Sequence, residues 1–175
     1  NWSAMRKESF QWWIQRLEHS LRQADLVRLD HFRGFCAYWE IPVEEETAVK
    51  GRWVEAPGRD LLTALRQHFG YSTLPIIAED LGIITPDVRE LMDDFELPGM
   101  KVLQFGFSGE PGSAPDAPFR HPRRSLVYTG THDNPPTKQW FAEAGEQERT
   151  NFVRYRGQDM DPELANEVLM RMALE

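Results

Sequence analysis

The sequence has 175 residues, with 28 acidic and 20 basic side chains and a formal net charge of −8, which argues against nucleic acid as a partner. Hydrophobic residues make up 41% of the chain, enough for one real core. This hydrophobic content excludes a disordered chain. No apolar run approaches the roughly 20 residues that cross a bilayer, so membrane insertion is excluded as well.

The first half of the chain alternates helical and extended patterns. Residues 4–24 carry apolar side chains at helical spacing and predict an amphipathic helix. Residues 25–32 predict a strand, and residues 35–57, which show no sustained period, are expected to form a long loop. A helix over 59–69, ended by Gly70, precedes a buried strand over 74–80.

The second half continues the alternation. Thr85 as N-cap and Pro86 at the first helical position predict the next helix. Strands are expected over 100–107 and 125–130, separated by a stretch rich in Gly, Pro and Ser over 108–122. The remaining patterns predict three helices, over 137–143, 147–156 and 162–175.

This order of elements predicts an α/β fold with a parallel sheet, because parallel strands need crossover connections. A doubly wound sheet would carry a glycine-rich phosphate turn after a strand, and no segment has that spacing. A (β/α)8 barrel places polar catalytic residues just past the carboxyl ends of several strands. Because this chain does so repeatedly, the barrel is favoured.

Three predicted strands end in carboxylates: Asp30 in RLDHFRGF, Glu79 with Asp80 in IIAEDLG, and Asp133 in TGTHDN. One such acid alone is usually a helix cap or a surface charge. A barrel would bring all three to one rim, where mutual repulsion raises at least one pKa. The sequence therefore favours a site built on paired carboxylates.

Paired carboxylates suit retaining glycoside chemistry, in which one attacks the anomeric carbon and a protonated one assists the leaving oxygen. Arg28 shares a strand face with Asp30 and would keep it ionised as nucleophile, although the two could equally form a structural pair. Glu79 ends an apolar strand, where partial desolvation favours the protonated acid, although it could equally be a helix N-terminal charge.

Other chemistries are less well supported. His31, His132 and the acids could hold a metal, yet no HxH or HExxH pairing occurs. No GxSxG motif exists, and Cys36, the only cysteine, has no nucleophile signature. His132 is expected to hydrogen-bond a substrate hydroxyl or to be structural. Trp39 and Trp53, in the expected loop, are candidate platforms for a sugar face, whereas Phe32 and Phe35 are expected in the core.

The motifs RLDHFRGF, IIAEDLG and TGTHDN, with KVLQF before the last, together resemble the 4-alpha-glucanotransferases called amylomaltases or disproportionating enzymes, of the alpha-amylase superfamily. The resemblance runs through essentially all 175 residues, including WWIQRL and FCAYWEIP. It implies a cytoplasmic enzyme without a cofactor or metal that transfers α-1,4-glucan segments between maltooligosaccharides. Asp30 would be the nucleophile, Glu79 the acid/base and Asp133 the third carboxylate. Arg28 and His132 would complete the donor subsite.

Family members are several hundred residues long, so residues 1–175 are expected to be a fragment of the catalytic barrel domain, with about strands 4 to 7 and their helices. The start without Met and the end inside a helical pattern agree with that expectation. Open barrel edges would favour self-association, and the fragment alone is expected to be inactive. Two alternatives remain at this point: a retaining α-glucan hydrolase, and a glucan-binding module without chemistry.

Overall fold

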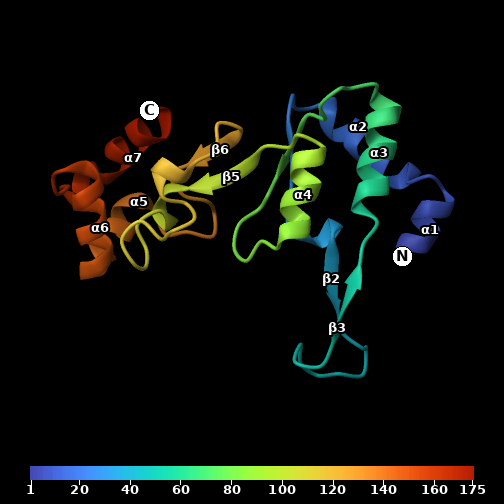
Figure 1. Ribbon diagram of the computed structural model, residues 1–175, viewed down its shortest axis with the longest axis horizontal. Helices are drawn as coiled ribbons and strands as arrows, with labels where there is room; N and C mark the ends of the chain where they lie inside the picture. Colours follow the sequence, from blue (N-terminus) through green and yellow to red (C-terminus); the bar gives the residue numbers. More distant parts are fainter. The chain divides into compact units, whose positions relative to one another are not determined.

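The computed structural model describes all of residues 1–175, which divide into two compact units, Asn1–Gly99 and Met100–Glu175 (Figure 1). Both units mix helices with short two-stranded sheets, so the chain has the expected α/β character. No helix is both long and apolar enough to cross a membrane.

The first unit opens with two helices, α1 (Trp2–Lys7) and α2 (Gln11–Leu21), where the sequence predicted one. The break falls at Ser9 and Phe10, which adopt left-handed backbone conformations with φ of 49° and 57°. This turn buries Phe10, which is 4% exposed, and Trp2 stacks on Trp13 at 6.4 Å between ring centroids. Tertiary packing therefore overrides the local helical pattern here.

A parallel pair of strands forms the centre of this unit. Strand β1 (Val27–Leu29) pairs with β4 (Ile76–Ala78), and Leu29 lies opposite Ala78. All three residues of β4 are buried, as its apolar run predicts. The crossover between the two strands includes α3 (Gly58–Phe69), as expected for parallel strands.

Helices α3 and α4 (Pro86–Asp94) begin and end close to where the sequence predicts. Gly70 ends α3 with a left-handed φ of 67°, and Pro86 occupies the first position of α4 after Thr85. The apolar faces of both helices enter one core with Phe32 and Phe35, both buried as expected. Helices α2 and α3 pack against each other in this core (Figure 1).

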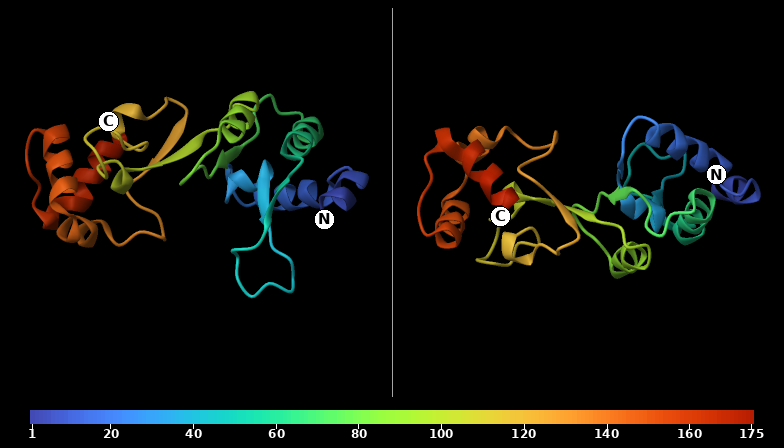
Figure 2. Two further views of the ribbon diagram at one scale, coloured as in Figure 1. Left: turned by 60° about the horizontal axis from the view of Figure 1, so that its bottom comes forward. Right: turned by 90° about the horizontal axis from the view of Figure 1, so that it is seen from above.

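The expected loop over 35–57 contains an antiparallel hairpin, so that prediction is wrong in part. Strand β2 (Ala37–Glu40) follows a short 3₁₀ helix (Phe32–Phe35) and pairs with β3 (Arg52–Glu55). Each strand has only four residues, too few for alternation to stand out in the sequence. The hairpin loop extends away from the helices of this unit (Figures 1 and 2).

The second unit is built on a two-stranded sheet of β5 (Gly99–Val102) and β6 (Ser125–Tyr128). The strand predicted over 100–107 is shorter, because the chain turns into a 3₁₀ helix at Leu103–Phe105. The glycine-rich and proline-rich stretch between the strands contains another 3₁₀ helix, Pro118–Arg120.

Three helices complete the second unit: α5 (Thr137–Glu143), α6 (Glu146–Arg156) and α7 (Ala165–Leu174). The helix predicted from residue 162 begins with a 3₁₀ turn at Pro162–Leu164. The helices, orange to red in Figure 2, enclose a second core that includes Phe141, Phe152 and Leu169.

Candidate active site

The carboxyl ends of β1 and β4 lie side by side and carry two of the predicted acids. Leu29 and Ala78 are partners in the parallel register, so Asp30 and Glu79 follow directly from paired residues. The backbone continues this pairing, since the Glu79 amide donates to the Leu29 carbonyl at 3.0 Å and the Phe32 amide donates to the Glu79 carbonyl at 3.1 Å. The strand ends thus place Asp30 and Glu79 at one edge.

Both carboxylate oxygens of Glu79 accept backbone hydrogen bonds. The amide of His31 donates to Oε2, and the amide of Leu81 donates to Oε1, each at 2.8 Å. His31 reaches this position in a left-handed backbone conformation, with φ 46° and ψ 54°, which is uncommon for residues other than glycine. Glu79 is therefore held at both oxygens by the chain around the two strand ends.

Asp30 forms the ion pair predicted with Arg28. Nη1 of Arg28 lies 2.8 Å from Oδ1 of Asp30, and the Asp30 side chain is 76% exposed. Both residues also line a cavity of about 290 Å³ whose other walls are largely apolar, including Trp13 and Phe35. The buried Nε1 of Trp13 has no hydrogen-bond partner. Asp30 thus combines a fixed positive neighbour with an open side.

Asp133 and His132 belong to the second unit, in the loop after β6. His132 Nε2 lies 3.4 Å from Asp133 Oδ2, and their side chains are 76% and 80% exposed. Asn134 shapes this loop, because its Oδ1 accepts from both the amide and the hydroxyl of Thr131 at 2.8 Å. The Asp133 amide in turn donates to the Thr131 hydroxyl at 3.3 Å.

Gln104 supports the same loop, a role that sequence reasoning missed. It is 3% exposed, and its Nε2 donates to the Pro135 carbonyl at 3.2 Å. A Cβ atom on Gly130 would lie only 2.5 Å from this Nε2, so a larger residue there would have to displace the Gln104 amide. The signal was a polar residue in the otherwise apolar run VLQF.

Trp39 lies on the hairpin and forms a cluster with Trp53. The two rings meet edge to face at 5.5 Å between centroids, and Trp39 Nε1 donates to the Ala48 carbonyl at 2.9 Å. The guanidinium of Arg33 lies 4.5 Å from the centre of the Trp53 ring. Arg33 was not singled out in the sequence, although it stands inside the motif RLDHFRGF. The cluster leaves both indoles partly exposed.

Comparison with known proteins decides the family. A family model described as 4-alpha-glucanotransferase, glycoside hydrolase family 77, matches residues 1–175. The chain belongs to this 4-alpha-glucanotransferase family. The resemblance drawn from the motifs is thereby confirmed.

Several relatives within the 4-alpha-glucanotransferase family are closely similar to the chain. It is 45% identical to a 4-alpha-glucanotransferase of Aquifex aeolicus over 99% of its own length, and 50% identical to one of Thermus thermophilus over 88%. A solved structure, an amylomaltase from Streptococcus agalactiae in complex with acarbose, is 34% identical and superimposes over 98% of the chain with a TM-score of 0.89. The chain spans about a third of the length of these relatives.

In this member of the 4-alpha-glucanotransferase family, the only cysteine is poorly suited to nucleophilic chemistry. Burial raises the pKa of the Cys36 thiol to about 11, and the nearby Asp87 carboxylate adds to the effect. The thiol also lies 3.8 Å from the Asp87 carbonyl. A thiol with this pKa is almost entirely protonated at neutral pH and is a weak nucleophile.

Proposed function

We propose that the chain supplies the catalytic carboxylates of a 4-alpha-glucanotransferase that moves α-1,4-glucan segments between maltooligosaccharides with retention. One observation carries the proposal: the paired ends of β1 and β4 place the Arg28–Asp30 ion pair beside the backbone-held Glu79. Membership of the family supports the substrate class.

Asp30 is the proposed nucleophile. Its carboxylate oxygen attacks the anomeric carbon while the bond from that carbon to the leaving oxygen breaks, and a glycosyl–Asp30 ester forms. Arg28, whose Nη1 lies 2.8 Å from Oδ1 of Asp30, fixes the direction in which this carboxylate points. The 4-hydroxyl of a second glucan then attacks the same carbon and releases Asp30, so two displacements give retention.

Glu79 is the proposed acid/base. It donates its proton to the leaving oxygen in the first step and takes the proton of the acceptor hydroxyl in the second. A protonated carboxyl keeps acceptor capacity at both oxygens, so the His31 and Leu81 amides hold it in place while its O–H is free to face the substrate.

The positions of the remaining site residues are explained by a barrel fold. We propose that β1, β4, β5 and β6 are four consecutive strands, about the fourth to seventh, of a (β/α)8 domain of which residues 1–175 are part. Their carboxyl ends then share one rim, which brings Asp133 and His132 to the ring hydroxyls of the bound sugar. Trp39 is the proposed aromatic platform for an outer sugar. The second edge of β1, unpaired in its two-stranded sheet, is where self-association would occur.

Incubation with maltotriose tests the function. A protein with the length of the relatives should produce both shorter and longer oligosaccharides, whereas the 175-residue chain alone should produce few. In the longer protein, Asp30→Asn and Glu79→Gln should each lower turnover by roughly three orders of magnitude or more, because each removes a reacting group.

The control is Asp25→Asn, which removes an exposed carboxylate just before β1 and should leave turnover unchanged. Ordinary turnover in either catalytic variant would refute that residue's role. Release of glucose and maltose without any longer product would instead indicate hydrolysis and would contradict transfer.

A further inference from the structure

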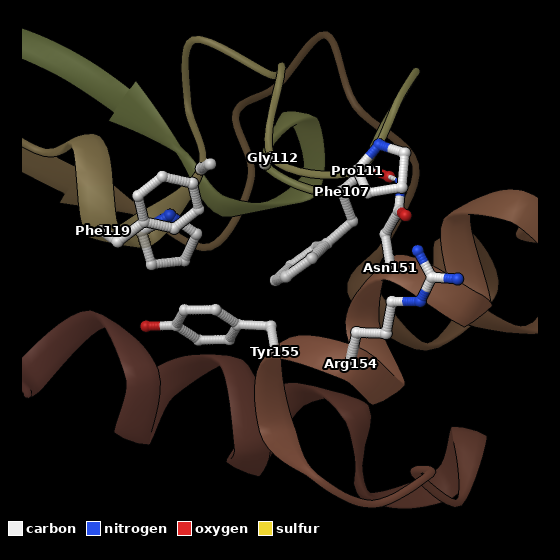
Figure 3. Close-up of a pocket in the computed structure, with 10 residues that line it drawn as sticks. Phe107, Pro111, Gly112, Phe119, Asn151, Arg154 and Tyr155 are labelled. Carbon is white, nitrogen blue, oxygen red and sulfur yellow. Dashed lines mark hydrogen bonds between the residues drawn. The ribbon is translucent and has the colours of Figure 1, made fainter.

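A second pocket, in the Met100–Glu175 unit, contains none of the residues assigned above. It encloses about 200 Å³ between helix α6 and the turn-rich stretch that joins β5 to β6 (Figure 3). Pockets for drug-sized ligands start at roughly 300 Å³, so this one has room for a single small ring rather than for an extended molecule.

Aromatic rings form its walls. Phe119 and Tyr155 lie on opposite sides of the opening, and the Phe107 ring lies to one side of the gap between them (Figure 3). Phe119 is 64% exposed and Tyr155 46%, whereas Phe107 is buried and lies 6.1 Å from the Tyr155 ring between centroids. Two ring faces are therefore open to a ligand above a buried third ring.

The frame around the rings is fixed by hydrogen bonds. The Nδ2 of the buried Asn151, on α6, donates to the carbonyls of Phe107 and Gly109 at 2.8 and 2.9 Å, which ties the helix to the turn-rich stretch. The Nε of Arg120 donates to the Gly112 carbonyl at 3.0 Å, and its guanidinium lies 5.8 Å from the Phe119 ring centre. A pre-formed pocket loses little conformational entropy on binding.

The polar groups at the pocket favour a ligand rich in hydroxyl groups. Arg154 lines it, and its guanidinium has no hydrogen-bond or ion-pair partner within the protein (Figure 3). The Tyr155 hydroxyl can both donate and accept. No carboxylate lines the pocket.

We propose that this pocket is an accessory binding site for one glucose ring of an α-1,4-glucan. A glucose ring has an apolar C–H face that packs on the electron-rich faces of Phe119 and Tyr155, and a rim of hydroxyls that accept from Arg154. The choice of an α-glucan over other sugars rests on the proposed function. Such a site would hold a long glucan chain by one of its rings.

Native gel electrophoresis of the 175-residue chain in gels with increasing soluble starch tests the proposal. Starch should retard the chain. Phe119→Ala and Tyr155→Ala should each weaken the apparent affinity about tenfold, since each removes one stacking face. Arg154→Gln should weaken it less.

Tyr71→Ala is the matched control, because Tyr71 is also 46% exposed and stacks on Phe69 in the other unit. It should be retarded like the unaltered chain, and equal thermal unfolding curves should show that all variants fold. Absence of retardation, or equal retardation of all variants, would overturn the proposal. Binding of AMP that depends on Tyr155, without starch retardation, would overturn it in favour of a nucleotide site.

The two proposals fail separately. Asp30→Asn should keep starch retardation while the longer protein with this substitution loses transfer. If the longer protein made no oligosaccharides, the transferase assignment would fall, but retardation lost in Phe119→Ala would still establish the glucan site.

Discussion

The strand ends at Asp30 and Glu79 and the loop at Asp133 hold their carboxylates in different ways. Glu79 accepts two hydrogen bonds from the backbone around paired strands, whereas the Asp133 side chain is 80% exposed and has only His132 beside it. The loop keeps its shape through Thr131 and Asn134 instead. Backbone hydrogen bonds thus position the first acid, and a side-chain turn positions the second.

This contrast predicts a difference in stability between matched substitutions. Glu79→Gln places an NH₂ group against one of two N–H donors, so one donor loses its partner, and we expect a loss of about 2 kcal/mol in the free energy of unfolding. Asp133→Asn removes no backbone contact and should stay within about 0.5 kcal/mol. Urea unfolding of both variants measures the difference, and equal values would break the comparison.

In the loop after β6, the free energy of unfolding is predicted to be more sensitive to a substitution of Gly130 than to one of Asp133. A methyl group there would lie 2.5 Å from Gln104 Nε2, so Gly130→Ala should lower stability by about 1–3 kcal/mol. Gly145→Ala is the control, because a Cβ there meets nothing within 4 Å. Thermal unfolding by circular dichroism compares the two, and a neutral Gly130→Ala would show that Gln104 does not support the loop.

The left-handed backbone at His31 gives a subtler test of the strand ends. His31→Val should be less stable than His31→Gly by about 1–2 kcal/mol, because glycine adopts this conformation freely. At His132, whose φ is not positive, valine should be at least as stable as glycine. Urea unfolding of the four variants tests the pattern, and the same order at both positions would remove the case for backbone strain at His31.

The last test concerns the Cys36 thiol, which follows the 3₁₀ helix Phe32–Phe35. Because the pKa of Cys36 is raised to about 11, the reactive thiolate is scarce at pH 8 and becomes abundant only as the pH rises toward 11. Iodoacetamide should label the folded chain about a hundredfold more slowly at pH 8 than an unfolded control, with a rate that rises with pH. Rapid labelling at pH 8 would show that the thiol is accessible and unperturbed.

The sequence predicted the strands and helices whose patterns were long or sharply capped. Buried β4 and the glycine-ended α3 are examples, since an apolar run and a C-terminal glycine are local signals. The break at Phe10 was missed, because a left-handed turn that buries one ring depends on a core whose other residues are mostly distant in the chain.

The site residues divide in the same way, into those with a local signal in the sequence and those whose position depends on distant parts of the chain. The Arg28–Asp30 pair could be predicted from strand spacing, because residues two apart share a face. The contacts of Glu79 with His31 and Leu81 could not, since they depend on an unusual backbone conformation and on the pairing of distant strands. Gln104 was missed because its partner, Pro135, lies 31 positions away.

The contact between the His31 amide and Glu79 has a consequence for stereochemistry. The peptide that ends at this amide starts at the carbonyl of Asp30, so a single peptide unit connects the proposed nucleophile to the proposed acid. Retaining enzymes keep their two carboxyls about 5–5.5 Å apart, and inverting enzymes leave about 6.5–9.5 Å for a water molecule. One residue inserted after Asp30 would remove this short link. The distance between the two carboxyls could then grow, and water could enter where the proposed glycosyl ester forms.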